Sequence, residues 1–210
     1  MEFNAGWFND HLASIGQDFL WRKASMCPCV NSNSGAAKHN CPLCNGKGRI
    51  WNDPVKTTAG MASEKVLRQW AQFGRFESGD AVLSVPENSP LYEAGQFDRV
   101  TMLNATDQFS LVLIRGQNDK INFPVQKVNR VYWIGSNGSS LVEGGVPIVD
   151  SNGQLSWFTG TPPIGTQYSV SGTRFSEYFV WDDMQGDRNH HYGSRLPRKL
   201  VVRRFDLFGR

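Results

Sequence analysis

Apolar residues in the second half of the chain fall in short β-branched and aromatic runs. Gly, Asn, Asp and Pro separate these runs at intervals of roughly ten residues, which is typical of an all-β domain. The runs span residues 81–86, 98–105, 109–116, 121–135, 144–150, 154–160, 166–175, 176–183 and 199–209. Two connecting segments, 136–140 and 150–154, contain Asn-Gly, a strong hairpin signal. The pattern predicts a mainly β fold in which a β-sandwich and a barrel are equally compatible with the sequence.

The first 25 residues have a different pattern, with apolar and aromatic residues at near-helical spacing. These residues are Trp7, His11, Leu12, Ile15, Phe19 and Leu20. We expect an amphipathic helix here, which either packs on its own domain or reaches a neighbouring subunit as an arm. The polar segment 52–60 reads as a loop. Residues 63–74 read as a second helix that begins at Ser63 and ends at Gly74, with a strand as the alternative.

These patterns divide the chain into three consecutive parts. They are an N-terminal helical arm (1–25), a four-cysteine zinc-knuckle region (26–60) and a β-rich assembly domain (61–210). A chain of 210 residues can bury a sizeable core without covalent or metal cross-links. We therefore do not expect the cysteines to be the main source of stability.

Composition restricts the classes of function. The net charge is +3, from 22 basic and 19 acidic residues, which argues against a general polyanion binder. Aromatic residues are abundant, with seven Trp, thirteen Phe and five Tyr, and such residues fill cores and interfaces. No segment has the run of about 20 apolar residues that crosses a membrane. The N-terminus lacks the features of a signal peptide, so we expect synthesis in a reducing cytoplasm, where thiols favour metals over disulfides.

All four cysteines lie in two close pairs, Cys27/Cys29 and Cys41/Cys44. Two such knuckles joined by a loop can close a tetrahedral four-thiolate zinc site. Gly46 and Gly48 allow left-handed turns that leave backbone N–H groups free to point at a thiolate, and Asn45 tolerates the same conformation. The segment CPLCNGKG resembles one Cys-x-x-Cys-x-Gly-x-Gly unit of chaperone-type zinc domains.

The identity of the site is not fixed by the spacing. Iron suits the same four thiolates, His39 is placed to substitute for one cysteine, and disulfides or free thiols are the remaining alternatives. A four-thiolate site has no open coordination position, so we expect a structural Zn²⁺ and no catalysis at Cys27, Cys29, Cys41 and Cys44.

Two further groups of residues carry candidate chemistry. The first, in segment 182–199, is a set of metal-type ligands that reads more simply as a hydrophilic loop: Asp182, Asp183, Asp187, His190 and His191. The second is a set of C-terminal cations, read either as a solvated strand edge or as a surface for an acidic partner or DNA. These cations are Arg188, Arg195, Arg198, Lys199, Arg203, Arg204 and Arg210.

The order of segments in the β region resembles neck, or head-to-tail connector, proteins of tailed bacteriophages. The segments are 74–103, 114–134, 160–183 and 196–207, together with the CPC…CPLCNGKG cysteine pattern. Most of the resemblance lies in the Gly-Asp, strand, Pro turn at 79–86 and in the Pro-Pro-x-Gly-Thr-x-Tyr-x-Val run at 162–170.

The resemblance implies a non-enzymatic virion protein, made in the host cytoplasm, that assembles as a homo-oligomeric ring between portal and tail proteins. It would touch packaged DNA only through phosphates and would not contact a membrane. A baseplate or tail-completion protein, a zinc-ribbon nucleic-acid-binding module and a virion-associated hydrolase using His190 and His191 are the alternatives.

Overall fold

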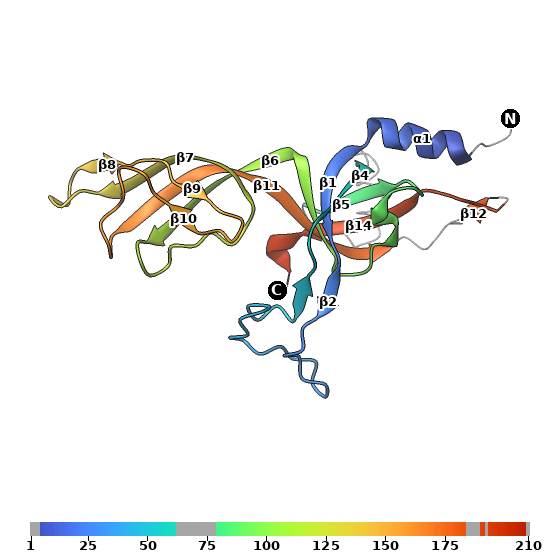
Figure 1. The fold of residues 1–210 in the computed structure, drawn as a ribbon, viewed down its shortest axis with the longest axis horizontal. Helices are drawn as coiled ribbons and strands as arrows, with labels where there is room; N and C mark the ends of the chain where they lie inside the picture. The colour runs from blue at the N-terminus through green and yellow to red at the C-terminus, as the bar shows by residue number, and fades with distance from the viewer. Residues whose placement is uncertain (1–4, 62–78, 184–189, 192, 209–210) are drawn as a thin grey trace. The chain divides into compact units, whose positions relative to one another are not determined.

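The computed structural model describes residues 5–61, 79–183, 190–191 and 193–208, and it is mainly β (Figure 1). The predicted helix at 63–74 lies outside the described residues. The elements are α1 (Ala5–Ile15), β1 (Gln17–Arg22), β2 (Ala24–Met26), β3 (Arg49–Trp51), β4 (Val55–Met61), β5 (Ala81–Val85), η1 (Pro90–Glu93), β6 (Arg99–Ile114), β7 (Val125–Ile134), β8 (Leu141–Glu143), β9 (Ile148–Val149), β10 (Leu155–Ser156), β11 (Gln167–Asp183), β12 (His190–His191), β13 (Ser194–Arg195), β14 (Arg198–Arg204) and η2 (Phe205–Leu207).

The chain forms two compact units. Unit 1 comprises residues 1–104 and 177–210, and unit 2 comprises residues 105–176. The predicted runs 98–105 and 109–116 form one continuous strand, β6, and the runs 166–175 and 176–183 form another, β11. Both strands belong to the two units at once, because the unit boundaries fall inside them at Asn104 and Ser176.

Unit 1 contains a closed barrel. Among the described residues, six strands pair in the order β14-β5-β4-β1-β6-β11, and β14 also pairs with β11 to close the ring. The structure therefore selects the barrel over the sandwich in this unit. It also corrects one reading of the C-terminal segment: β14 has a hydrogen-bonded neighbour on each side and is not a strand edge.

The barrel interior is lined by alternating strand residues. Phe19, Val85, Val100, Leu200 and Val202 are each fully buried. Period-two alternation places these side chains on one side of their strands, which is the pattern of a closed sheet around a filled core.

The N-terminal helix is shorter than predicted. α1 ends at Ile15, and residues Gln17–Arg22 form β1 between β4 and β6. Gly16 stands at the transition, where a Cβ atom would lie 2.9 Å from the carbonyl oxygen of Leu12. Beyond it Phe19 and Trp21 are buried at alternate positions, a strand pattern that also fits helical spacing over so short a segment. The loop predicted at 52–60 is likewise wrong, because β4 occupies most of it.

Unit 2 has its own core. The buried residues are Leu113, Ile121, Val128, Val131, Leu155, Tyr168 and Val170. Both predicted Asn-Gly hairpins are confirmed: residues 135–140 join β7 to β8, and residues 150–154 join β9 to β10. In each turn an Asn or Asp side chain, Asn137 or Asp150, accepts backbone N–H hydrogen bonds. No described helix is both long and apolar enough to cross a membrane.

Candidate metal centre

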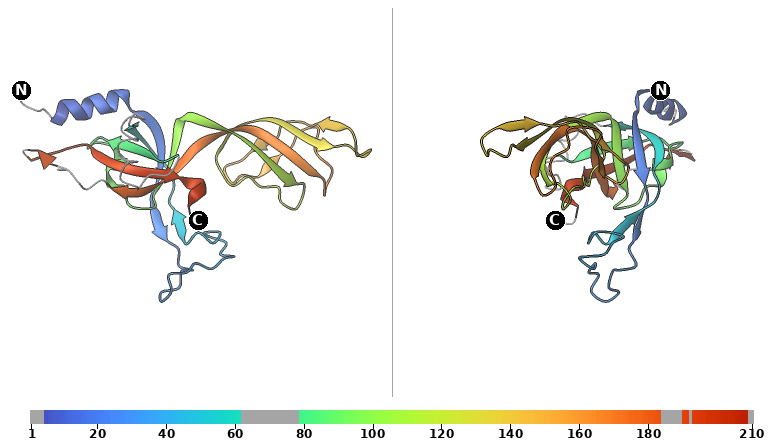
Figure 2. Two further views of the ribbon diagram at one scale, coloured as in Figure 1. Left: turned by 180° about the vertical axis from the view of Figure 1, so that it is seen from behind. Right: turned by 60° about the vertical axis from the view of Figure 1, so that its left-hand side comes forward.

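The four cysteines lie on a loop that extends from the barrel. β2 and β3 pair as a short ribbon, and the segment between them, residues 27–48, is here called the cysteine loop (Figure 2). The ribbon closes this segment at its base, where the Cys27 N–H donates to the carbonyl oxygen of Gly48 at 2.9 Å. A single long excursion of the chain thus returns to its starting point and brings the two knuckles together.

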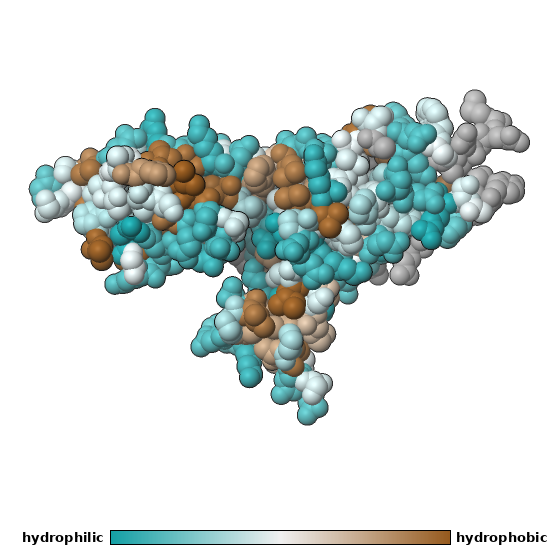
Figure 3. Space-filling view, viewed as in Figure 1, coloured by the Kyte–Doolittle hydropathy of each residue, from teal (hydrophilic) through white to brown (hydrophobic). Residues whose placement is uncertain are grey.

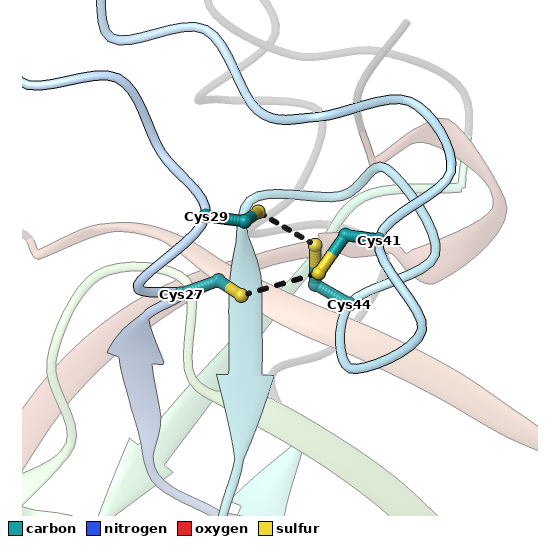
Figure 4. A group of neighbouring side chains, drawn as sticks. All are labelled: Cys27, Cys29, Cys41 and Cys44. Carbon is teal, nitrogen blue, oxygen red and sulfur yellow. Dashed lines mark hydrogen bonds between the residues drawn. The ribbon is translucent and has the colours of Figure 1, made fainter.

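The four thiols point toward one another (Figure 4). All four Sγ atoms lie within 4.8 Å of one another. The Cys27–Cys41 and Cys29–Cys44 Sγ···Sγ distances are 3.7 and 3.5 Å. A tetrahedral zinc site with Zn–S bonds of about 2.3 Å has an S···S edge of about 3.8 Å. The donor set therefore fits a four-coordinate metal ion.

The glycine-rich turn after Cys44 has the predicted left-handed geometry. Asn45, Gly46 and Gly48 have φ values of 49°, 79° and 70°. The Gly48 N–H donates to the Cys44 Sγ at 3.4 Å, as expected for a turn that stabilises a thiolate. At Gly46 a Cβ atom would lie 2.9 Å from the carbonyl oxygen of His39, so a larger residue there is opposed by space as well as by φ.

The electrostatic environments of the thiols differ. Backbone hydrogen bonds from Cys44 and Leu43 lower the pKa of Cys41 to about 6. Loss of solvent, together with the neighbouring thiols, raises the pKa of Cys29 to about 12. A cation placed among the four sulfurs would favour the thiolate form of each, since a coordinating thiol is deprotonated by the metal itself. Cys27, Cys41 and Cys44 are buried and Cys29 is partly exposed.

Within the described residues, these cysteines are the single group of three or more Cys, His, Asp or Glu side chains with metal-binding geometry, and His39 does not belong to it. The aspartates and histidines of segment 182–199 do not form a second such group among the described residues. Asp183 is held by Arg198 at 2.6 Å, His190 is exposed on the β12–β13 hairpin, and Asp187 lies outside the described residues.

The predicted C-terminal basic surface is largely neutralised. Arg198 pairs with Asp183, Arg203 with the buried Asp80, and Arg204 with Asp206. Sequence reasoning could not find the partner of Arg203, because Asp80 lies 123 residues from it along the chain.

Aromatic side chains fasten the base of the cysteine loop to the barrel. Trp51, on β3, contacts Phe205 and Phe208 edge-to-face at 5.3 and 5.7 Å between ring centroids. The indole N–H of Trp51 donates to the carbonyl oxygen of Phe97 at 3.1 Å. The base of the cysteine loop is thus joined to the barrel by packed rings and one hydrogen bond.

No protein family model and no curated protein matches this chain.

Proposed function

We propose that this chain is a structural protein of a bacteriophage virion, a neck protein that assembles as a ring between portal and tail. The sequence resemblance supplies the biological setting. In this role the barrel is a rigid body, and zinc bound by the four thiolates orders the cysteine loop so that it can contact a neighbouring ring. Neither part is catalytic. A four-thiolate zinc ion has no free position at which a substrate could bind.

The observation that carries the assembly role is the exposure of large apolar side chains on unit 2. Figure 3 shows apolar residues gathered on the visible face of this unit. The exposed set comprises Val112, Ile134, Leu141, Val146, Ile148, Phe158 and Ile164, each more than half exposed. Exposed apolar residues that gather in patches mark interaction sites, whereas scattered ones need no explanation.

Three of these residues form a defined surface, here called the apolar ribbon face: Val146, Ile148 and Phe158. Ile148 pairs with Ser156 in the β9–β10 ladder. Val146 lies two residues before Ile148, and Phe158 lies two residues after its partner. The Gly145 N–H donates to the Gly160 carbonyl oxygen at 2.9 Å, so the two segments stay close beyond the ladder, although the chain bends at residues 158–160. Val146, Ile148 and Phe158 are exposed, whereas the adjacent Pro147, Val149 and Trp157 are buried or half-buried, and this alternation places the three on the outer side of the ribbon.

A second copy of the chain is the occupant we propose for the apolar ribbon face. In a ring, each subunit contacts the next through two different surfaces. The apolar ribbon face of one subunit therefore packs against a different surface of its neighbour, and not against the same face. Burying Phe158 and its two neighbours removes three apolar side chains from water, and each contributes a part of the about 1.5–3 kcal/mol of a fully exposed side chain, because they are 51–76% exposed in the free chain.

Sedimentation velocity over a concentration series tests this proposal. The expected result is concentration-dependent assembly of the native chain, with closed rings visible by electron microscopy. Phe158→Asp should weaken association at least about tenfold, because it places a charge in the contact. Asn152→Asp, an exposed site in the β9–β10 turn, adds the same charge and should assemble like the native chain. Equal association of all three proteins, or a chain that stays monomeric throughout, would contradict the proposal.

A further inference from the structure

Two arginines face each other across neighbouring barrel strands. In the β1–β6 ladder, Arg22 is the direct cross-strand partner of Arg99. Like charges directly opposite on paired strands destabilise a sheet. Such a pair is retained at a net cost unless other groups offset it.

Cations from the cysteine loop lie beside this pair. The Lys47 Nζ atom is 4.3 Å from the ring centroid of Phe205, and the Arg99 guanidinium carbon is 4.2 Å from the same centroid. Arg49, on β3, lies over the ring of Phe97 at 4.5 Å. The basic cluster is therefore Arg22, Lys47 and Arg99, contributed by β1, the cysteine loop and β6, all within unit 1.

One carboxylate opposes these charges, and Arg99 occupies it. The Arg99 guanidinium donates to both oxygens of Glu177 at 2.7 and 2.6 Å. Thr101 donates to the same carboxylate and accepts a hydrogen bond from Arg22 at 3.1 Å. Among the described residues, no carboxylate forms an ion pair with Arg22, Lys47 or Arg49. Desolvation by burial and the charge of Arg99 lower the pKa of both Arg22 and Lys47, and the charge of Glu177 offsets part of this effect.

We propose that the basic cluster binds a phosphate group, of the kind carried by the nucleic-acid backbone. A phosphate presents several charged oxygens to donors that approach from different directions, and Arg and Lys are the side chains that bind it. Arg22 and Lys47, the two cations of the cluster without an ion pair among the described residues, both lie beside Arg99, so a single oxyanion can contact more than one cation. Phosphate contacts carry no sequence information, so this binding to DNA would be independent of sequence.

This inference goes beyond ring assembly and does not depend on it. The cations lie in unit 1, whereas the proposed subunit contact lies on unit 2. It also gives the cysteine loop a role, because an ordered loop holds Lys47 beside Arg99 at the ring of Phe205.

Fluorescence anisotropy with a labelled mixed-sequence DNA duplex tests the proposal on the metal-loaded full chain. The test variant is Arg22→Gln/Lys47→Gln, which leaves the Arg99–Glu177 pair intact. The matched control is Lys127→Gln/Arg130→Gln, which removes the same charge from exposed positions of unit 2. Metal content is measured for each protein, so that a loss of binding cannot be attributed to a lost ion.

We expect the native chain and the control to bind DNA alike, with an affinity that falls as salt rises. The test variant should bind more weakly, and its log–log salt slope should be shallower by about one, because the site holds one phosphate. Without ligand its melting temperature should be unchanged or higher than that of the native chain, because a repulsion is relieved. If Arg22 and Lys47 had a purely structural role, the test variant would have a lower melting temperature than the native chain and would bind DNA with the same salt slope.

A second arm identifies the source of the phosphate. Inorganic phosphate should raise the melting temperature of the native chain more than chloride at equal ionic strength, and the test variant should not respond. Stabilisation by phosphate without DNA binding would assign the site to a small phosphate compound, which supports the phosphate chemistry but not the backbone. If neither ligand distinguishes the native chain from the test variant, or if the control loses as much DNA affinity, the proposal is wrong.

Discussion

Replacing Asp98 with alanine removes three hydrogen bonds at the base of the cysteine loop. Asp98 is 1% exposed. Its carboxylate accepts from the indole N–H of Trp21 at 2.8 Å, from the Ala24 N–H at 2.7 Å and from the Gly95 N–H at 2.9 Å. It therefore holds the end of β1 and the start of β2 in place.

The expected loss of stability depends on whether each of the three N–H donors can find another acceptor once the Asp98 carboxylate is removed. Gly95 is exposed, so its N–H can bond to water. Trp21 is buried and Ala24 is half-buried, so their donors are left without a comparable acceptor. A lost hydrogen bond to a charged group costs about 1.5–3 kcal/mol. Two such losses predict that Asp98→Ala lowers the free energy of unfolding by about 3–6 kcal/mol, a large share of the about 5–15 kcal/mol typical of a domain.

Urea denaturation followed by tryptophan fluorescence measures this change. Asp53→Ala, at an exposed position, is the matched control and should change the free energy of unfolding by no more than about 0.5 kcal/mol. Asp98→Asn should fall between the two, because the amide keeps one acceptor oxygen. A loss below about 1 kcal/mol for Asp98→Ala, at an unchanged m-value, would refute the role assigned to this carboxylate.

Three further predictions concern unit 2 and the cysteine loop. Gly153→Ala should lower the free energy of unfolding by at least about 2 kcal/mol in chemical denaturation, because φ is 80° and a Cβ atom would lie 1.9 Å from the Ile121 carbonyl oxygen. The control is Gly165→Ala, at a glycine with the same φ but open space around it, which should lower the free energy of unfolding by only about 1 kcal/mol. Burial and the hydrogen bond to Asp119 raise the pKa of Tyr168 above its unfolded value of about 10. The unfolded state therefore releases this proton first, and stability should decline as pH rises above about 10, less steeply in Tyr168→Phe; equal slopes in pH-dependent denaturation would contradict this. A strong chelator should make the cysteine loop sensitive to limited proteolysis while the far-ultraviolet circular dichroism of the barrel persists, and uniform digestion would count against a local role for the metal.

The strands of unit 2 and the C-terminal strand could be predicted because their signals are local. β-branched runs and Asn-Gly turns identify themselves within a few residues, and the structure places strands or hairpins at most of them. The joining of two predicted strands into β6 could not be foreseen from the polar segment around Asp107. Such composition usually marks a turn, but here side chains alternate in exposure along a continuous strand that passes from one unit to the other.

Strands β1 and β4 were missed for different reasons. Six residues such as Gln17–Arg22 are too few to separate period two from period 3.6, so the preceding helix appeared to continue. Val55–Met61 is rich in small and polar residues, and its burial comes from barrel closure, which is a tertiary effect.

The cysteine site was predictable because its ligands are grouped in sequence. The basic cluster was not, because its residues are distant in sequence: strand register joins Arg22 to Arg99, and the ring of Phe205 joins Lys47 to Arg99. Asp80, the partner of Arg203, was hidden because it is likewise distant in sequence.

Native mass spectrometry of the protein, with elemental analysis of the same sample, tests the central claim most directly. The account predicts one zinc ion per chain in the native protein and none after Cys41→Ser/Cys44→Ser, with the barrel still folded. A chain without metal whose mass is lower by about four hydrogens, the signature of two disulfides, would contradict the four-thiolate centre.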